Sequence, residues 1–249
     1  MHREDFHSLF NCPGPVITPV IHALDAEQCI RNVHVALHEG AHGIFLINHD
    51  FPYPEFLPIV KDVRAAFPDV WLGLNFLAQT GEVAFPVLGE LKQQGCIIDA
   101  YWADDACIDE HSDKTNQDDA LRINAAKEKS SWDGFYMGGT CFKKQREVKP
   151  EHYAVSAELA THYMDAVCTS GVATGKEADP EKIDIFREAI GEHTLALASG
   201  VTPENALIYK TVDCFLVSTG INKDNDFYNI DALKLRSLMN VTRTIGDAR

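Results

Sequence analysis

Short apolar runs alternate with longer amphipathic segments along the chain, and this alternation occurs eight times. The runs are rich in β-branched residues and begin mostly about 30 residues apart, which is the length of one strand–helix unit. They cover residues 16–22, 43–48, 70–75, 97–102, 134–138, 165–169, 194–199 and 212–218. Residues 43–47 and 214–217 are apolar at successive positions, as in strands buried on both faces, so the sequence predicts a parallel sheet.

The segments between the runs carry helix start signals. Asp25, Asp179 and Asp231 each precede an apolar stripe with helical spacing. Thr202 offers a capping hydroxyl directly before a proline, a residue suited to the first position of a helix. We therefore expect an amphipathic helix after most of the strands.

Eight strand–helix units predict a (β/α)8 TIM barrel, an α/β fold with a single domain over residues 16–249. An open doubly wound sheet is the alternative. It needs no eighth unit and usually carries a glycine-rich first turn, which this sequence lacks. Residues 1–15 are expected to form an N-terminal leader that covers the floor of the barrel.

Composition and charge exclude several classes of protein. A chain of 249 residues with 45% hydrophobic and 24% charged residues is neither disordered nor fibrous. The formal net charge of −15 argues against a nucleic-acid partner, because phosphate backbones are bound by clustered Lys and Arg. No window reaches the roughly 18 apolar residues of a membrane span. Seven widely spaced cysteines without a C-x-x-C pair indicate reduced thiols, so we expect a cytoplasmic protein with no metal and no cofactor.

Small residues dominate the ends of the last three predicted strands, where the loops of such barrels carry their chemistry. Glycine lets backbone N–H groups approach an anion closely, and the loops after strands seven and eight hold a phosphate in many barrels. The candidate phosphate-binding residues are Ser170, Gly171, Ser199, Gly200, Ser218, Thr219 and Gly220. A phosphorylated small molecule is therefore the expected partner. In the alternative interpretation these residues only turn the chain.

Polar side chains at the other strand ends are candidates for proton transfer and for orienting a ligand. His22, Asp50, Asp104 and Asp105 are the candidate acids and bases, and His22 is favoured because it ends an otherwise apolar strand. The two adjacent aspartates could equally cap the following loop.

Two side-chain amides and two lysines complete the set of candidates. Asn48 and Asn75 could orient a hydroxyl or a carbonyl group of a ligand. Lys143 and Lys144 could reach an anion or form a Schiff base, although a lysine pair in a long polar loop is usually solvated.

Three short motifs imitate known sites without meeting their requirements. Residues 38–42 spell the zinc-protease pattern H-E-x-x-H, but a glycine after the glutamate ends the helix that both histidines need. Residues 171–176 have one residue too few for a nucleotide-binding P-loop. Residues 224–235 lack the glycine and the glutamate of a calcium loop.

The last third of the chain resembles the BtpA/SgcQ family. The resemblance rests on residues 169–175, Asp179–Pro180, residues 199–205 and residues 218–224, with isolated points such as His22 and Asn75 in the first half. It implies a TIM barrel of the ribulose-phosphate-binding type. Members of the family are linked to photosystem I biogenesis and to uncharacterised sugar or nucleoside operons. The chain departs from the family pattern after His22 and at the end of the fifth predicted strand.

Two hypotheses from different classes follow. The first is an enzyme of isomerase or lyase type that acts on a sugar phosphate or a nucleoside-like phosphate. The second is a non-catalytic assembly or scaffold factor, similar to the BtpA protein of photosystem I biogenesis. We favour the first, because the predicted helices are acidic and mixed, whereas a scaffold on a membrane surface needs a basic amphipathic helix or an apolar patch. A homo-oligomer is compatible with either.

Overall fold

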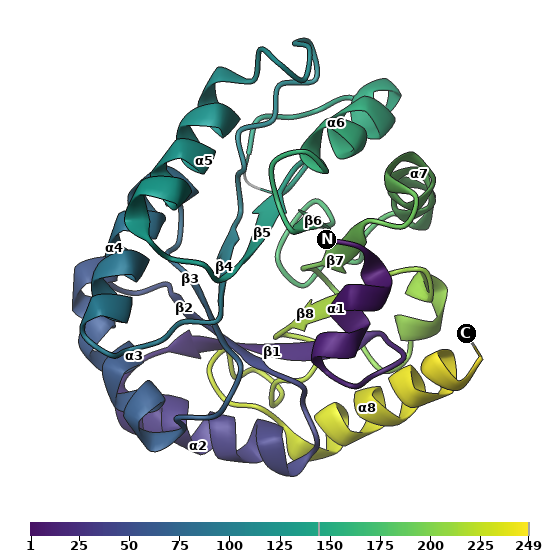
Figure 1. Ribbon diagram of the computed structural model, residues 1–249. Helices are drawn as coiled ribbons and strands as arrows, with labels where there is room; N and C mark the ends of the chain where they lie inside the picture. The colour runs from purple at the N-terminus through teal and green to yellow at the C-terminus, as the bar shows by residue number, and fades with distance from the viewer. Residues whose placement is uncertain (144, 249) are drawn as a thin grey trace.

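A computed structural model describes residues 1–143 and 145–248 of the protein. Eight parallel strands form a closed barrel in which each strand pairs with its neighbours in chain order (Figure 1). The strands are β1 (Val16–Ala23), β2 (Ile44–Asn48), β3 (Leu72–Asn75), β4 (Ala100–Ala103), β5 (Phe135–Gly139), β6 (Ala166–Thr169), β7 (Thr194–Leu197) and β8 (Cys214–Val217). The predicted single-domain (β/α)8 barrel is confirmed, and the open sheet is excluded because β1 pairs with β8.

Helices surround the barrel and follow most of the strands. They are α1 (Arg3–Leu9), α2 (Ala26–His38), α3 (Tyr53–Ala66), α4 (Gly81–Gln93), α5 (Asp118–Ser130), α6 (Tyr153–Ala160), α7 (Pro180–Ile190) and α8 (Ala232–Asp247). Two 3-10 helices, η1 (Pro150–His152) and η2 (Ala206–Tyr209), complete the set. The predicted caps are confirmed at Asp25, Asp179 and Asp231, whose carboxylates accept backbone N–H groups of the first helical turns. The prediction of an α-helix after Thr202 is wrong, because the short connection from β7 to β8 forms only the 3-10 helix η2.

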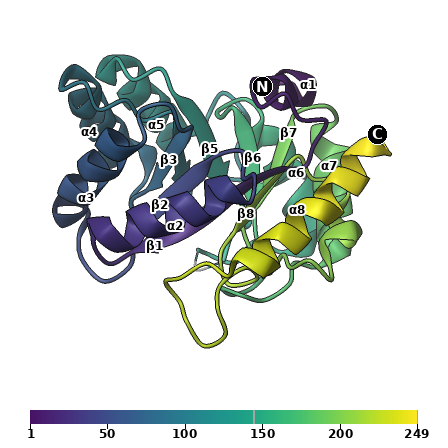
Figure 2. The ribbon, with the colours of Figure 1, turned by 90° about the horizontal axis from the view of Figure 1, so that it is seen from below.

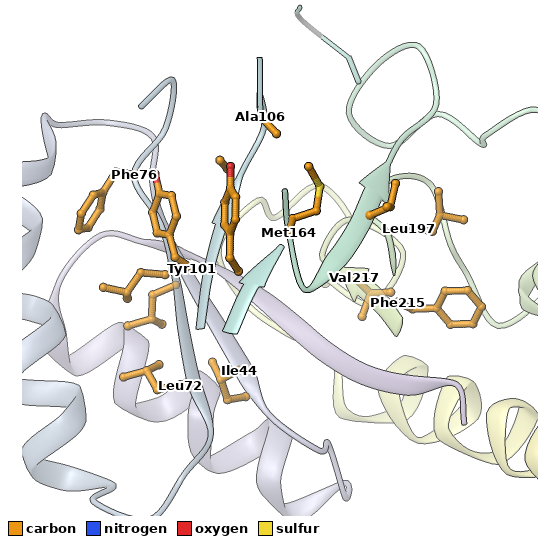
Figure 3. Close-up of a cluster of buried hydrophobic side chains, with 14 of the residues drawn as sticks. Ile44, Leu72, Phe76, Tyr101, Ala106, Met164, Leu197, Phe215 and Val217 are labelled. Atoms are coloured by element: carbon orange, nitrogen blue, oxygen red, sulfur yellow. The ribbon is translucent and has the colours of Figure 1, made fainter. Parts of the chain in front are cut away.

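Alternate residues of each strand face opposite sides of the barrel wall. Val16 and Val20 of β1 belong to the cluster that fills the barrel interior, whereas Ile17 and Ile21 pack in the larger cluster between strands and helices. Figure 3 shows members of this outer cluster, among them Ile44 and Leu72. This alternation decides which side chain at each strand end faces the axis.

The first helix packs against one end of the barrel. Phe6 of α1 is fully buried in the interior cluster, where its ring lies 5.2 Å from that of Phe10 and 5.3 Å from that of Phe135. Arg3 forms a 2.8 Å ion pair with Asp213, the residue before β8. Seen from the side, α1 and the loop between β8 and α8 lie at opposite ends of the molecule (Figure 2). None of the helices in the described part of the chain has the length and apolar character that a membrane crossing requires.

Candidate functional site

A pocket lies at the end of the barrel where the strands finish. The pocket is narrow. Its volume is about 590 Å³ when the open mouth is included, but only a small part of this space is wide enough for a water molecule. Trp102, Leu216, Ile47 and Val20 form its apolar wall. The predicted residues that line it are His22, Asp104, Lys143, Ser199, Gly200, Ser218, Thr219 and Gly220. The barrel therefore brings together side chains that are almost 200 residues apart in the chain.

The loops after β6, β7 and β8 meet at one corner of this pocket. Gly200 has a φ of +60°, and a Cβ atom built on it would lie 2.3 Å from the carbonyl oxygen of Lys176. A Cβ atom on Gly220 would lie 2.0 Å from the carbonyl oxygen of Val201. Both positions therefore require glycine, because the neighbouring backbone leaves no room for a side chain.

We define Lys143, Ser199, Gly200, Ser218, Thr219 and Gly220 as the anion corner. The backbone N–H groups of Gly200, Thr219 and Gly220 donate to no acceptor within the part of the chain that the structure describes. Ser199 differs, because its hydroxyl lies 2.7 Å from the Lys176 carbonyl and 2.9 Å from that of Ala173 and so holds the loop after β6. The available donors at this corner are thus mainly backbone amides.

Lys143 provides a positive charge at the same corner. Its Nζ donates to the carbonyl of Ala198 at 2.9 Å, one residue before Ser199, and its backbone N–H donates to the hydroxyl of Ser170 at 2.8 Å. Among the described residues that line the pocket it is the sole lysine or arginine. Sequence reasoning gave this lysine little weight. The overlooked signal is the preceding Phe142, whose burial in the barrel interior draws the loop over the mouth.

His22 is 4% exposed and points into the pocket from the end of β1. Its Nδ1 lies 3.0 Å from the carbonyl oxygen of Phe227 and 3.2 Å from the hydroxyl of Ser218. The Phe227 ring is stacked on the imidazole, with 3.8 Å between ring centroids. Burial lowers the pKa of His22 to about 4, despite the opposing effect of the Phe227 carbonyl. The side chain is therefore a neutral imidazole at neutral pH.

His49 lines the pocket although the sequence analysis chose its neighbour, Asn48. On β2, Phe45 and Ile47 face the interior, so the alternation brings His49 to the same side and turns Asn48 away. Asn48 instead holds two loops, since its Nδ2 donates to Phe51 at 2.7 Å and its Oδ1 accepts from the Leu77 N–H at 3.0 Å. In the structure, Asn48 therefore connects loops and does not line this pocket.

The same alternation separates Asp104 from Asp105. Asp104 lines the pocket and accepts a 3.0 Å hydrogen bond from Nδ2 of Asn75. Asp105 accepts the Cys107 N–H at 2.8 Å and caps a turn outside the pocket. Asn75 is buried behind the lining, and its Oδ1 has no partner among the described residues. A buried oxygen of this kind is unusual in a structural position and is more typical of a functional site.

Three further predicted residues lie outside the pocket. Asp50 is exposed and accepts a 3.0 Å hydrogen bond from the Tyr228 hydroxyl. Ser170 and Gly171 border a separate cavity between the loops after β5 and β6, on the far side of Lys143. There the Ser170 hydroxyl supports the loop of Lys143 rather than facing the anion corner.

No cluster of three or more possible metal ligands occurs in the described part of the chain. In the H-E-x-x-H segment, His38 ends α2, Glu39 pairs with Arg236 at 2.6 Å, and His42 Nδ1 accepts the Ile17 N–H at 3.0 Å. The two imidazoles therefore serve different parts of the fold, as the sequence analysis expects.

Comparison with known proteins finds a family model that matches part of the chain. Residues 148–244, which contain most of the anion corner, match the model of the BtpA family. This match confirms the resemblance seen in the last third of the sequence. No curated protein matches the chain.

Several solved structures share the fold. The α subunit of tryptophan synthase from Legionella pneumophila aligns with a TM-score of 0.64 and 13% identity over 100% of both chains. A structure described as native KDPGal gives 0.63 and 10% identity over 93% of this chain and 96% of that one. Phosphoribosyl anthranilate isomerase from Thermus thermophilus gives 0.60 and 15% identity over 94% and 99%. At these identities the likeness shows a common barrel fold.

Proposed function

We propose that the protein is a barrel enzyme that acts on a small phosphorylated metabolite, with the phosphate bound at the anion corner. The observation that carries the proposal is the set of backbone N–H groups at Gly200, Thr219 and Gly220 that have no acceptor in the described chain, next to the ammonium of Lys143. Backbone amides and a lysine are common ligands of phosphate. The molecule as a whole carries a net charge of −15 and repels anions, so the attraction for a phosphate is confined to this corner.

The groups at the other side of the pocket suit proton transfer. His22 and Asp104 face the same narrow space as the anion corner. A neutral imidazole accepts a hydrogen bond or a proton, and a carboxylate does the same or donates when protonated. Isomerisation or lyase chemistry on a short sugar phosphate fits this arrangement, and one protein of similar fold is a phosphoribosyl anthranilate isomerase.

Thermal unfolding in the presence of ligands tests the proposal. We expect the midpoint to rise with the concentration of inorganic phosphate or of a sugar phosphate, by the equivalent of about 2.7 kcal/mol at a hundredfold excess over Kd. Lys143→Gln removes a charge-assisted hydrogen bond and is expected to weaken binding roughly tenfold or more. Nucleotides belong in the same panel, because a pocket this narrow should accept them poorly.

A charge variant with a matched control locates the ligand. Thr219 is exposed, so Thr219→Glu places a negative charge at the corner without disturbing the core, and it should abolish the rise. Val172→Glu introduces the same charge on the loop after β6, at a residue that is 87% exposed and lies outside the pocket, and should bind as the wild type does. Variants of Gly200 are unsuitable, because a side chain there collides with the backbone. If no phosphorylated compound changes the unfolding midpoint, the result contradicts the enzyme proposal and favours the alternative of a non-catalytic scaffold.

A further inference from the structure

The loop between β8 and α8 is fastened across the end of β1. We refer to residues 221–230 of this loop as the strap, which lies at the end of the barrel opposite α1 (Figure 2). Two buried amides of α2 hold it, since Nε2 of Gln28 and Nδ2 of Asn32 donate to the carbonyl of Tyr228 at 2.7 and 3.0 Å. Asn32 also accepts the N–H of Ile230 at 2.8 Å. Buried amides on a helix face are costly unless they are paired, so these contacts fix the strap firmly.

Phe227 of the strap contacts His22 through both its ring and its backbone carbonyl. The ring of Phe227 stacks on the imidazole with an interplanar angle of 10°, and its carbonyl lies 3.0 Å from Nδ1. A second anchor, Nδ2 of Asn222, donates to that same carbonyl at 2.9 Å and keeps it in place. A carbonyl oxygen only accepts hydrogen bonds, so Nδ1 must carry the hydrogen in this contact. The other ring nitrogen, Nε2, is then the one with the lone pair.

We propose that Phe227 is the positioning residue of His22: it fixes the Nδ1–H tautomer and thereby makes Nε2 a hydrogen-bond acceptor for a hydroxyl group of the ligand. The ligand half of this inference rests on the proposed function, whereas the tautomer does not. Ser218 lies 3.2 Å from Nδ1 and directly precedes Thr219 and Gly220 of the anion corner. The ligand hydroxyl that donates a hydrogen bond to His22 is therefore close to the ligand's phosphate group. The substrate class is then a short hydroxylated phosphate ester.

The charged groups around His22 are consistent with a neutral acceptor. Burial is the main cause of the lowered His22 pKa, and His49 at the end of β2 and Lys143 in the loop after β5 lower it further. The Phe227 carbonyl and, more weakly, Asp50 favour the imidazolium, but they do not outweigh burial. A phosphate dianion at the anion corner adds a large negative charge nearby. It should raise the pKa of His22 towards its ordinary value, which makes the side chain a better base only when the ligand is bound.

The tautomer is directly measurable by nitrogen NMR of protein labelled at histidine, with His22→Gln identifying the resonances. We expect a pyrrole-like Nδ1 and a pyridine-like Nε2 at neutral pH. In Phe227→Ala, the ring that shields His22 from water is lost, so the pKa of His22 should rise by about one unit or more. The backbone carbonyl that accepts from Nδ1 remains in this variant, so the Nδ1–H tautomer should persist. Phe227→Tyr keeps the stacked ring and should restore the wild-type pKa of His22.

A control and two outcomes decide between the possibilities. Tyr228 lies on the same strap, next to Phe227. Tyr228→Phe removes only its hydroxyl, which contacts Asp50, and should leave the tautomer of His22 unchanged. A wild-type protein in the Nε2–H form, or a folded Phe227→Ala protein with an unaltered His22 pKa, would overturn the role assigned to Phe227. Inorganic phosphate then tests the ligand separately. A rise in the His22 pKa supports a phosphate group bound at the anion corner near His22, and no change rejects the ligand half while the tautomer result stands.

Discussion

Asp213 is a carboxylate with no exposed surface, placed directly before β8 at the floor of the barrel. It forms ion pairs with Arg3 at 2.8 Å and with Arg187 at 2.5 Å, and it also accepts the N–H of Leu195 at 3.0 Å. Burial alone would raise the pKa of Asp213, but a hydrogen bond from His7 and the two guanidinium groups lower it overall. The buried charge is thus stabilised by partners from three parts of the chain.

Asp213→Asn should destabilise the protein by about 3–5 kcal/mol, because it leaves two largely buried guanidinium groups without their carboxylate. Since the folded-state pKa lies below the unfolded value, the carboxylate contributes stability above about pH 4, and that stability is lost as the pH falls. Urea unfolding across this pH range measures both effects, and the variant should show the smaller acid loss. Asp133→Asn, in an exposed ion pair with Lys92, is the control and should behave as wild type.

The direction in which each residue at a strand end faces is harder to predict from the sequence than the strand end itself. The strand ends were predictable because apolar runs stop there, but the side that each residue faces changes with every step along the strand. From the sequence, Asp104 and Asp105 are therefore equal candidates, whereas the pocket lining contains Asp104 and not Asp105. Likewise Asn48 is a candidate in the sequence, but its neighbour His49 lines the pocket. Counting the alternation back from the buried strand residues would have corrected the second choice.

Among the elements, α1 is the one that closes the floor of the barrel. Phe6 is fully buried against the rings of Phe10, which directly follows α1, and of Phe135 in β5, while Leu9 on the same helix is 57% exposed. A helix of this length gains its stability from such packing rather than from its own hydrogen bonds.

Phe6→Ala should cost about 3–5 kcal/mol of unfolding free energy, because it leaves a cavity in the barrel interior. Leu9→Ala should change it by no more than about 0.5 kcal/mol. Denaturant unfolding gives both values. A small loss for Phe6→Ala would mean that α1 is dispensable for the barrel.

The strap and the loop of Lys143 could not be located from the sequence, for a physical reason. Both are long connections whose course depends on contacts with distant elements, such as the amides of Gln28 and Asn32 on α2. Those amides lie on a buried face of a helix, where the sequence offers no hint of their partner. Local patterns specify strands, caps and turns, whereas the tertiary contacts that carry the pocket are non-local.

For the whole molecule, the count of eight units was sufficient to predict the closed barrel. The overall charge of −15 was also visible, but its effect on stability depends on how closely the fold packs the acidic groups. Like charges on a compact surface repel each other, and salt screens that repulsion.

Potassium chloride should therefore raise the unfolding midpoint at pH 7. Between about 10 mM and about 150 mM salt the Debye length falls from about 30 Å to about 8 Å, which removes most long-range repulsion. Near the sequence pI of about 5.0 the net charge vanishes, so the same change in salt should have little effect. Equal responses at the two pH values would contradict the explanation. Chloride is chosen because phosphate and sulfate could occupy the anion corner.

The interlocking of Gly200 with the carbonyl of Lys176, and of Gly220 with that of Val201, has a consequence for protein engineering. Three consecutive loops share one rigid framework, so insertions or diversified libraries in any of them would deform the other two. New substrate preferences are better sought in the connections after β2, β3 and β4, which frame the opposite half of the mouth. Randomisation at His49 and Leu77 would reshape that half of the pocket, while the anion corner would remain unchanged.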